Sequence, residues 1–189
     1  MPFNLPIFLT WLRVGLIPVF VIVFYLSGSV LTPRSANLVA ALIFAVASVT
    51  DWLDGYLARR LGQTSSFGAF LDPVADKLIV AAALILLVAE GRTYAWLAMI
   101  IIGREIAISA LREWMAEMGK RKSVAVATIG KLKTSAQMAA ILLLLFAEPL
   151  IPGVSTLVLG NAFMVVAAIL TLWSMVYYLR MAVHEFSGK

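Results

Sequence analysis

Four aspartates lie within long apolar stretches of this 189-residue chain. Asp51 and Asp54 are three residues apart, and Asp72 and Asp76 are four apart, so each pair shares one face of a helix. Close carboxylates repel one another unless cations lie between them, and each costs at least ~2.5 kcal/mol in hydrocarbon. Mg²⁺ is usually shared between carboxylates and phosphates. The aspartates therefore predict a divalent-metal site that handles phosphate groups, with two Mg²⁺ ions expected and Mn²⁺ as the alternative ion.

The helices that hold these carboxylates follow from composition. Hydrophobic residues make up 62% of the chain and charged residues 13%, against roughly 45–50% and about 25% in soluble domains. A spanning helix needs about 20 apolar residues. The sequence thus predicts an all-α integral membrane protein with six transmembrane helices, in a single transmembrane catalytic domain over residues 1–189. The six segments run near Phe8–Ser27, Ala36–Leu61, Gly68–Ala89, Tyr94–Leu111, Thr128–Ala147 and Thr156–Met181.

A short polar turn at residues 62–66 separates the second and third segments. If these segments fold as an antiparallel pair, the turn brings the two aspartate pairs to the same depth, near one membrane surface. Gly55 and Ala58 share the face of Asp51 and leave room for a ligand to approach the backbone.

Basic residues indicate the orientation in the membrane. With a cytosolic N-terminus, the outside loops hold Arg34 and Arg92, and the basic residues of the inside segments are more numerous. This asymmetry satisfies the positive-inside rule with both termini cytosolic. It also accounts for the net charge of +5 without nucleic acid as a partner. The opening stretch Pro2–Leu9 is expected to lie in the membrane interface before the first span.

The stretch DWLDGYLARRLGQTSSFGAFLDPVAD satisfies the pattern D-x2-D-G-x2-A-R-x8-G-x3-D-x3-D at every specified position. It resembles the signature of the CDP-alcohol phosphatidyltransferases. Further stretches resemble the bacterial branch of the family that uses glycerol 3-phosphate, so the resemblance covers essentially the whole chain. They are Asn4, Pro6, Thr10 and Arg13, then Gly103-Arg104-Glu105, Ala110-Leu111-Arg112-Glu113-Trp114, and Gly130-Lys131-Leu132-Lys133-Thr134 with Gln137.

The resemblance implies roles for individual residues. Asp51, Asp54 and Asp72 would be metal ligands, and Asp76 the general base with a further contact to metal. The CDP-diacylglycerol site would comprise Asn4, Thr10, Arg13, Gly55, Ala58, Arg59, Ser65 and Gly68. Attack by the acceptor would be direct, with CMP leaving. The family further implies a homodimer in the bacterial cytoplasmic membrane, with the active site facing the cytosol.

Four basic residues are candidates for the second substrate. Arg104 and Arg112 are eight apart, roughly on one helix face, and Lys131 and Lys133 begin the fifth segment. Arginine offers a planar fork of donors to phosphate, so these residues predict glycerol 3-phosphate as the acceptor. Two other interpretations stay open: Arg104 as a partner of Glu105 or an aspartate, and the lysines as snorkelling side chains.

Competing functions follow from the same residues. A sibling enzyme would use serine, inositol phosphate or phosphatidylglycerol as acceptor, and the basic residues argue against serine. A membrane prenyltransferase also binds diphosphate through aspartates. Such enzymes have two separated aspartate-rich motifs in a longer chain, whereas this chain has one compact cluster. A cation transporter could use intramembrane aspartates, and would be expected to show repeats or broken helices, which this sequence does not display.

Overall fold

The computed structural model describes residues 5–61, 66–118, 127–150 and 153–187. Within these ranges the chain forms helices and no strand, which confirms the all-α prediction. The helices are α1 (Leu5–Tyr25), α2 (Pro33–Leu61), α3 (Ser66–Ala89), α4 (Ala95–Glu117), α5 (Ala127–Phe146) and α6 (Thr156–Ser187).

Each helix corresponds to one predicted apolar segment. The largest differences are at the ends of α4 and α6, which run on from Leu111 to Glu117 and from Met181 to Ser187. Both extensions contain charged or polar residues, so they fall outside an apolar segment while still continuing the helix. At the other end of the chain, Leu5 to Leu9 already belong to α1. Their position in a membrane interface stays a prediction.

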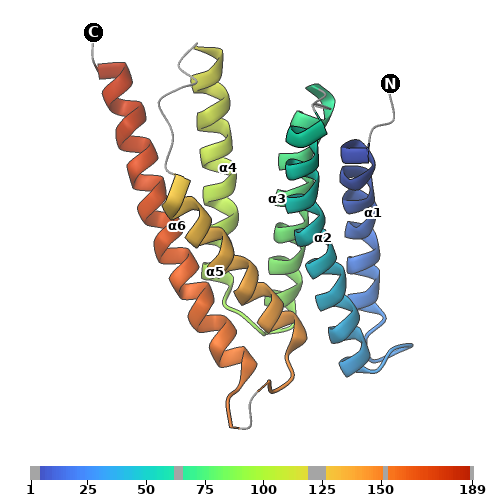
Figure 1. Cartoon of the computed structure of the whole chain (residues 1–189). Helices are drawn as coiled ribbons and strands as arrows, with labels where there is room; N and C mark the ends of the chain where they lie inside the picture. Colours follow the sequence, from blue (N-terminus) through green and yellow to red (C-terminus); the bar gives the residue numbers. More distant parts are fainter. Residues whose placement is uncertain (1–4, 62–65, 119–126, 151–152, 188–189) are drawn as a thin grey trace.

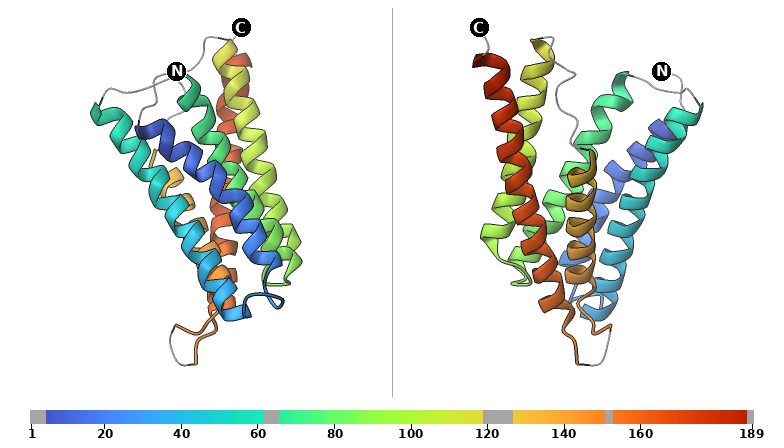
Figure 2. Two further views of the ribbon diagram at one scale, coloured as in Figure 1. Left: turned by 90° about the vertical axis from the view of Figure 1, so that its right-hand side faces the viewer. Right: turned by 60° about the vertical axis from the view of Figure 1, so that its left-hand side comes forward.

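The helices run alternately up and down (Figure 1). The upper end in Figure 1 holds the starts of α1 and α3 and the ends of α2, α4 and α6. The lower end holds the connections that follow α1, α3 and α5. α5 packs against α6 and also contacts α2 and α3, so it joins the two sides of the molecule. Toward the upper end, α4 and α6 stand apart from α1 and α2 in both figures (Figure 2).

The described surface of the molecule carries many large apolar side chains. Among the residues that the structure describes, three helices are long and apolar enough to cross a membrane, within Phe8–Tyr25, Pro33–Asp51 and Thr156–Val183. Charged residues lie within α3 and α4. Large apolar side chains are nevertheless exposed on every helix, as expected for contact with lipid. Examples are Ile22, Leu42, Ile85, Met99, Leu132 and Val158. The protein is therefore a helical membrane protein, and the six-span topology stays a prediction.

The core lies between the lower halves of the helices, and Gly160 of α6 packs there against α5. A Cβ atom built on Gly160 would lie 2.7 Å from Cγ of Leu144 and 3.3 Å from the carbonyl oxygen of Ala140. Leu144 and Ala140 are both fully buried. The absence of a side chain at Gly160 therefore allows these two helices to pack at short range.

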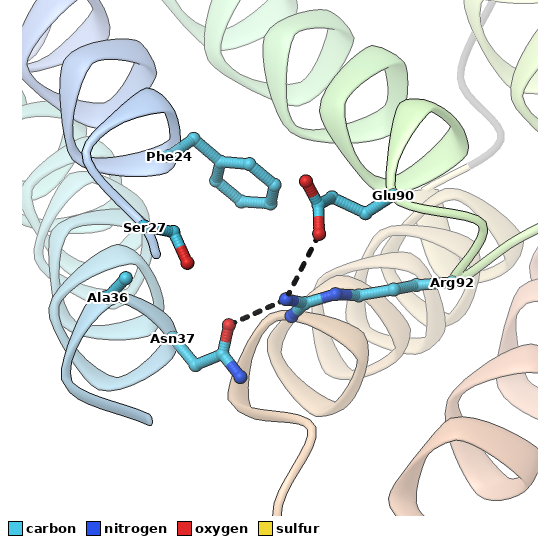
Figure 3. Close-up of a pocket in the computed structure, with 6 residues that line it drawn as sticks. All are labelled: Phe24, Ser27, Ala36, Asn37, Glu90 and Arg92. Carbon is cyan, nitrogen blue, oxygen red and sulfur yellow. Dashed lines mark hydrogen bonds and ion pairs between the residues drawn. The ribbon is translucent and has the colours of Figure 1, made fainter. Parts of the chain in front are cut away.

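Arg92 joins the helices at the lower end (Figure 3). Its Nη2 donates to Oδ1 of Asn37 in α2 at 2.7 Å, and its Nη1 donates to the carbonyl oxygens of Leu144 and Leu145 at 3.3 and 3.2 Å. The guanidinium also lies 5.6 Å from the ring centroid of Phe24 in α1. Burial lowers the pKa of Arg92, and the nearby carboxylate of Glu90 opposes that change.

Asn161 ties α6 to the same connection. Its Nδ2 donates to the carbonyl oxygen of Arg92 at 2.8 Å, and its Oδ1 accepts from Oγ1 of Thr93 at 2.8 Å. A small hollow beside Arg92 is lined by Phe24, Ser27, Ala36, Asn37 and Glu90 (Figure 3). The lower end is therefore a structural junction between helices, which we call the Arg92 junction.

Candidate active site

Arg13 of α1 brings together carboxylates from α2 and α3. Its side chain is fully buried, and its Nη1 lies 3.2 Å from Oδ1 of Asp51 and also pairs with Oδ1 of Asp76. One turn earlier, Oγ1 of Thr10 donates to Oδ1 of Asp72 at 2.5 Å. The predicted meeting of the two aspartate pairs is thus observed for Asp51, Asp72 and Asp76. We call these three aspartates, with Thr10 and Arg13, the acidic group.

The acidic group is open on one side. The side chain of Asp51 is 43% exposed and that of Asp76 is 34% exposed, while Arg13 behind them has no exposure. Carboxylates in this position would repel each other, and a buried cation already offsets part of that repulsion. Carboxylate oxygens are the hard ligands that Mg²⁺ prefers, so the donor set fits the predicted metal.

The position of a metal ion stays a prediction. Among the side chains that the structure describes, no group of three or more His, Cys, Asp or Glu lies close enough to hold a metal. The side chain of Asp54, a member of the predicted ligand set, is outside this part of the structure.

A second cluster forms where α4, α5 and α6 meet. Oε1 of Glu105 accepts from Nη1 of Arg104 at 3.0 Å and from Nζ of Lys133 at 2.5 Å. Arg104 and Lys133 are both more than nine-tenths buried. The predicted grouping of Arg104 with Lys133 is therefore observed, and so is the alternative contact of Arg104 with Glu105. Both hold at once because Glu105 lies between the two cations.

Two residues of α6 complete this cluster. Nη2 of Arg104 donates to Oγ of Ser174 at 3.0 Å, and Nη2 of Arg112 donates to the hydroxyl of Tyr178 at 2.7 Å. The ring of Tyr178 lies 5.7 Å from the guanidinium of Arg104 and 5.0 Å from that of Arg112. Together these residues form what we call the basic group: Arg104, Glu105, Arg112, Lys133, Ser174 and Tyr178.

The two groups face the same half of the molecule. Oγ of Ser48 in α2 donates to Sδ of Met138 in α5 at 3.7 Å. Asp51 follows Ser48 by one turn toward the upper end, and Lys133 precedes Met138 in the same direction because α5 runs downward. Both groups therefore lie just above the contact between α2 and α5.

Several predicted site residues are not described in full. Asn4 and Ser65 lie outside the described residues. Asp54, Gly55, Ala58 and Arg59 belong to α2 and Lys131 to α5, but their side chains are not described. Gly68 is buried near the start of α3.

Sequence reasoning missed the contributions of α6. Ser174 and Tyr178 are four residues apart and therefore share one helix face. Their polar atoms within an apolar helix were the available signal. It is a weak one, because a hydroxyl can also be satisfied by its own helix.

Comparison with known proteins places these groups in a family. The family model for CDP-alcohol phosphatidyltransferase matches residues 3–173. Three bacterial relatives are named CDP-diacylglycerol–glycerol-3-phosphate 3-phosphatidyltransferase. The one from Pectobacterium atrosepticum is 55% identical over 98% of both chains. Those from Shigella flexneri (54%, 96% of both chains) and Haemophilus influenzae (53%, 96% of this chain and 95% of the relative) are similarly close. With its signature aspartates and its match over almost the full length, this chain belongs to the CDP-alcohol phosphatidyltransferase family.

Proposed function

We propose that this protein transfers the phosphatidyl group of CDP-diacylglycerol to sn-glycerol 3-phosphate, which yields phosphatidylglycerophosphate and CMP. The names of the full-length relatives support this activity. The observation that carries the acceptor assignment is the basic group, which lies on the same side of the α2–α5 contact as the acidic group.

The basic group has the chemistry of a phosphate site. Arg104, Arg112 and Lys133 supply three cations against the single carboxylate of Glu105, which leaves two net positive charges. A phosphate monoester carries about −1.5 to −2 at pH 7. An acceptor without net negative charge, such as serine, would leave the excess positive charge beside buried Arg104 and Lys133 uncompensated, which is costly.

Two further polar atoms favour a ligand with several oxygens. Nε of Arg104 and Oγ1 of Thr171 are buried and have no hydrogen-bond partner in the described part of the chain. Thr171 lies one turn before Ser174, whose Oγ donates to the Thr171 carbonyl oxygen. Phosphate or hydroxyl oxygens of glycerol 3-phosphate would give these atoms partners.

The acidic group would act on the nucleotide and on the attacking hydroxyl. Asp51, Asp54, Asp72 and Asp76 would hold two divalent ions, which when bound neutralise the diphosphate and stabilise the departing CMP. Asp76 is the general base and accepts the proton of the glycerol hydroxyl. Its ion pair with Arg13 orients it.

The reaction is a direct displacement. The hydroxyl oxygen of glycerol 3-phosphate attacks the phosphorus that carries diacylglycerol, the bond from that phosphorus to the oxygen of CMP breaks, and CMP leaves. No covalent enzyme intermediate forms. Initial-rate kinetics should therefore show a sequential pattern, and a ping-pong pattern would contradict direct attack.

The membrane setting follows the same proposal. The six helices span the bacterial cytoplasmic membrane, the upper end with both termini faces the cytosol, and two copies form a homodimer. Basic residues at the cytosolic end support the orientation. A cytosolic upper end would give the acidic and basic groups access to the soluble substrate.

Turnover by the purified protein in detergent tests the function. CDP-diacylglycerol and Mg²⁺ are supplied with glycerol 3-phosphate, inositol phosphate, serine or phosphatidylglycerol, and both CMP and lipid product are measured. We expect CMP release with glycerol 3-phosphate alone. Asp76→Asn should abolish release, while Glu90→Gln at the lower end, the same chemical change, should not. Release with another acceptor would overturn the acceptor, and no release with any acceptor would overturn the enzyme assignment.

A further inference from the structure

Glu105 holds a position that the proposed reaction does not by itself require. It lies beside Arg104 in α4, yet its Oε1 reaches Lys133 in α5 at 2.5 Å as well as Arg104 at 3.0 Å. A carboxylate between two buried cations is at first sight unfavourable for a phosphate site, because it occupies donors that phosphate needs. A carboxylate at this position therefore needs a physical explanation.

The cations of the basic group differ in what holds them. Arg104 also donates to Ser174, and Arg112 donates to Tyr178, so α6 anchors both guanidinium groups. The ring of Tyr178 contacts both of them. Lys133 has no such anchor: within the described part of the chain, Glu105 is the hydrogen-bond partner of its ammonium group. The position of Lys133 therefore depends on Glu105.

Charge leads to the same conclusion. Lys133 is 6% exposed and lies near Arg104, and two neighbouring buried cations disfavour each other without a carboxylate between them. A lysine side chain has four rotatable bonds and loses much rotamer freedom when it is fixed in one place. Glu105 thus offsets the repulsion between Lys133 and Arg104 before substrate binds. It also offsets the entropy cost of fixing the Lys133 side chain in one position.

We propose that Glu105 is a positioning residue for the acceptor, which holds Lys133 against Arg104 and sets the net charge of the basic group to match a phosphate dianion. This inference rests on the proposed function. Glu105 touches the lysine and the arginine, and its effect on the acceptor passes mainly through Lys133. The Lys133 ammonium then needs no reorganisation when the phosphate binds.

A double-mutant cycle tests this dependence. The variants are Glu105→Ala, Lys133→Ala and the double variant, with Glu117→Gln, an exposed carboxylate of the same helix, as control. Each is assayed for kcat and for the KM of both substrates. Glu105→Ala should raise the KM for glycerol 3-phosphate about tenfold, with kcat and the KM for CDP-diacylglycerol within about twofold, the pattern of lost binding. The control should match the unaltered protein.

The double variant separates the two possible routes of action. If Glu105 acts through Lys133, the double variant should have the acceptor KM of Lys133→Ala alone, within about twofold. If the two effects multiply in full, or if Glu105→Ala leaves the acceptor KM unchanged, the inference is wrong. A general loss of kcat would assign Glu105 to catalysis or folding and would also overturn it.

Glu105→Gln provides a second test of the inference if Glu105→Ala does not fold. The amide oxygen can still accept from Lys133 while the charge is lost, so the acceptor KM should rise by about threefold. An acceptor KM equal to that of the unaltered protein would contradict the inference. Failure of the unaltered protein to use glycerol 3-phosphate would instead overturn the proposed function, so the two failures are distinguishable.

Discussion

Arginines with little or no exposure organise both ends of the molecule, but their partners differ. At the lower end, Arg92 donates chiefly to neutral oxygens, which are backbone carbonyls of α5 and the amide of Asn37. At the upper end, Arg13 and Arg104 pair with carboxylates that are partly exposed. Carbonyls at a helix end cannot be exchanged for a ligand without breaking local structure, whereas carboxylates can share their charge with incoming ions. We therefore expect the partner, more than burial, to separate a structural arginine from one that serves the proposed reaction.

The strongest test of this difference is Arg13→Gln. Removing the guanidinium leaves Asp51 and Asp76 without their shared cation and without a fixed orientation. We expect CMP release to fall about 1,000-fold, equivalent to ~4 kcal/mol of lost transition-state stabilisation. Turnover within about threefold of the unaltered protein would show that Arg13 is only a packing residue.

Arg92→Ala should have the opposite profile. It deletes hydrogen bonds to Asn37, Leu144 and Leu145 and leaves buried acceptors unsatisfied, which should lower the free energy of unfolding by about 3 kcal/mol. The kcat per folded molecule should not change. Thermal unfolding in detergent and CMP release on the same sample measure both quantities. A large fall in kcat with normal stability would remove the distinction between the two ends.

Gly160→Ala tests the close packing of α5 against α6 at the lower end. Its new Cβ would approach Leu144 to 2.7 Å, so α5 and α6 must shift. Overpacking of this kind should cost about 1–2 kcal/mol of stability. Gly15→Ala is the matched control, since a Cβ there meets nothing within 4 Å. Equal melting temperatures for the two variants would contradict the close helix contact.

Tyr178→Phe should have the smallest effect. It removes the hydroxyl that accepts from Arg112 and keeps the ring that contacts both guanidinium groups. The KM for glycerol 3-phosphate should rise about threefold to tenfold, as for one lost hydrogen bond to a charged group. Tyr177→Phe, a change on an exposed neighbouring side chain, is the control. Equal acceptor KM values for the two variants would remove Tyr178 from the basic group.

Local pattern was enough to predict the helices and much of the site. The lengths of the apolar segments predicted the six helices, and the errors at α4 and α6 arose where charged residues continue a helix beyond its apolar part. The spacing of Arg104 and Arg112 indicated a common face, and the structure brings both to Tyr178. Such features depend on residues within a few turns of each other, which is the range over which helical periodicity carries information.

The sequence by itself therefore determined the helical membrane class, the family and the charged candidate residues of both groups, but not Ser174 and Tyr178 of α6. Only the tertiary structure decided which of these residues touch: Arg13 with Asp51 and Asp76, Lys133 with Glu105, and Arg92 with the end of α5. These contacts join different helices, and they depend on how each helix is tilted and rotated against its neighbours. Periodicity along a single helix does not specify tilt or rotation, because packing between helices sets both.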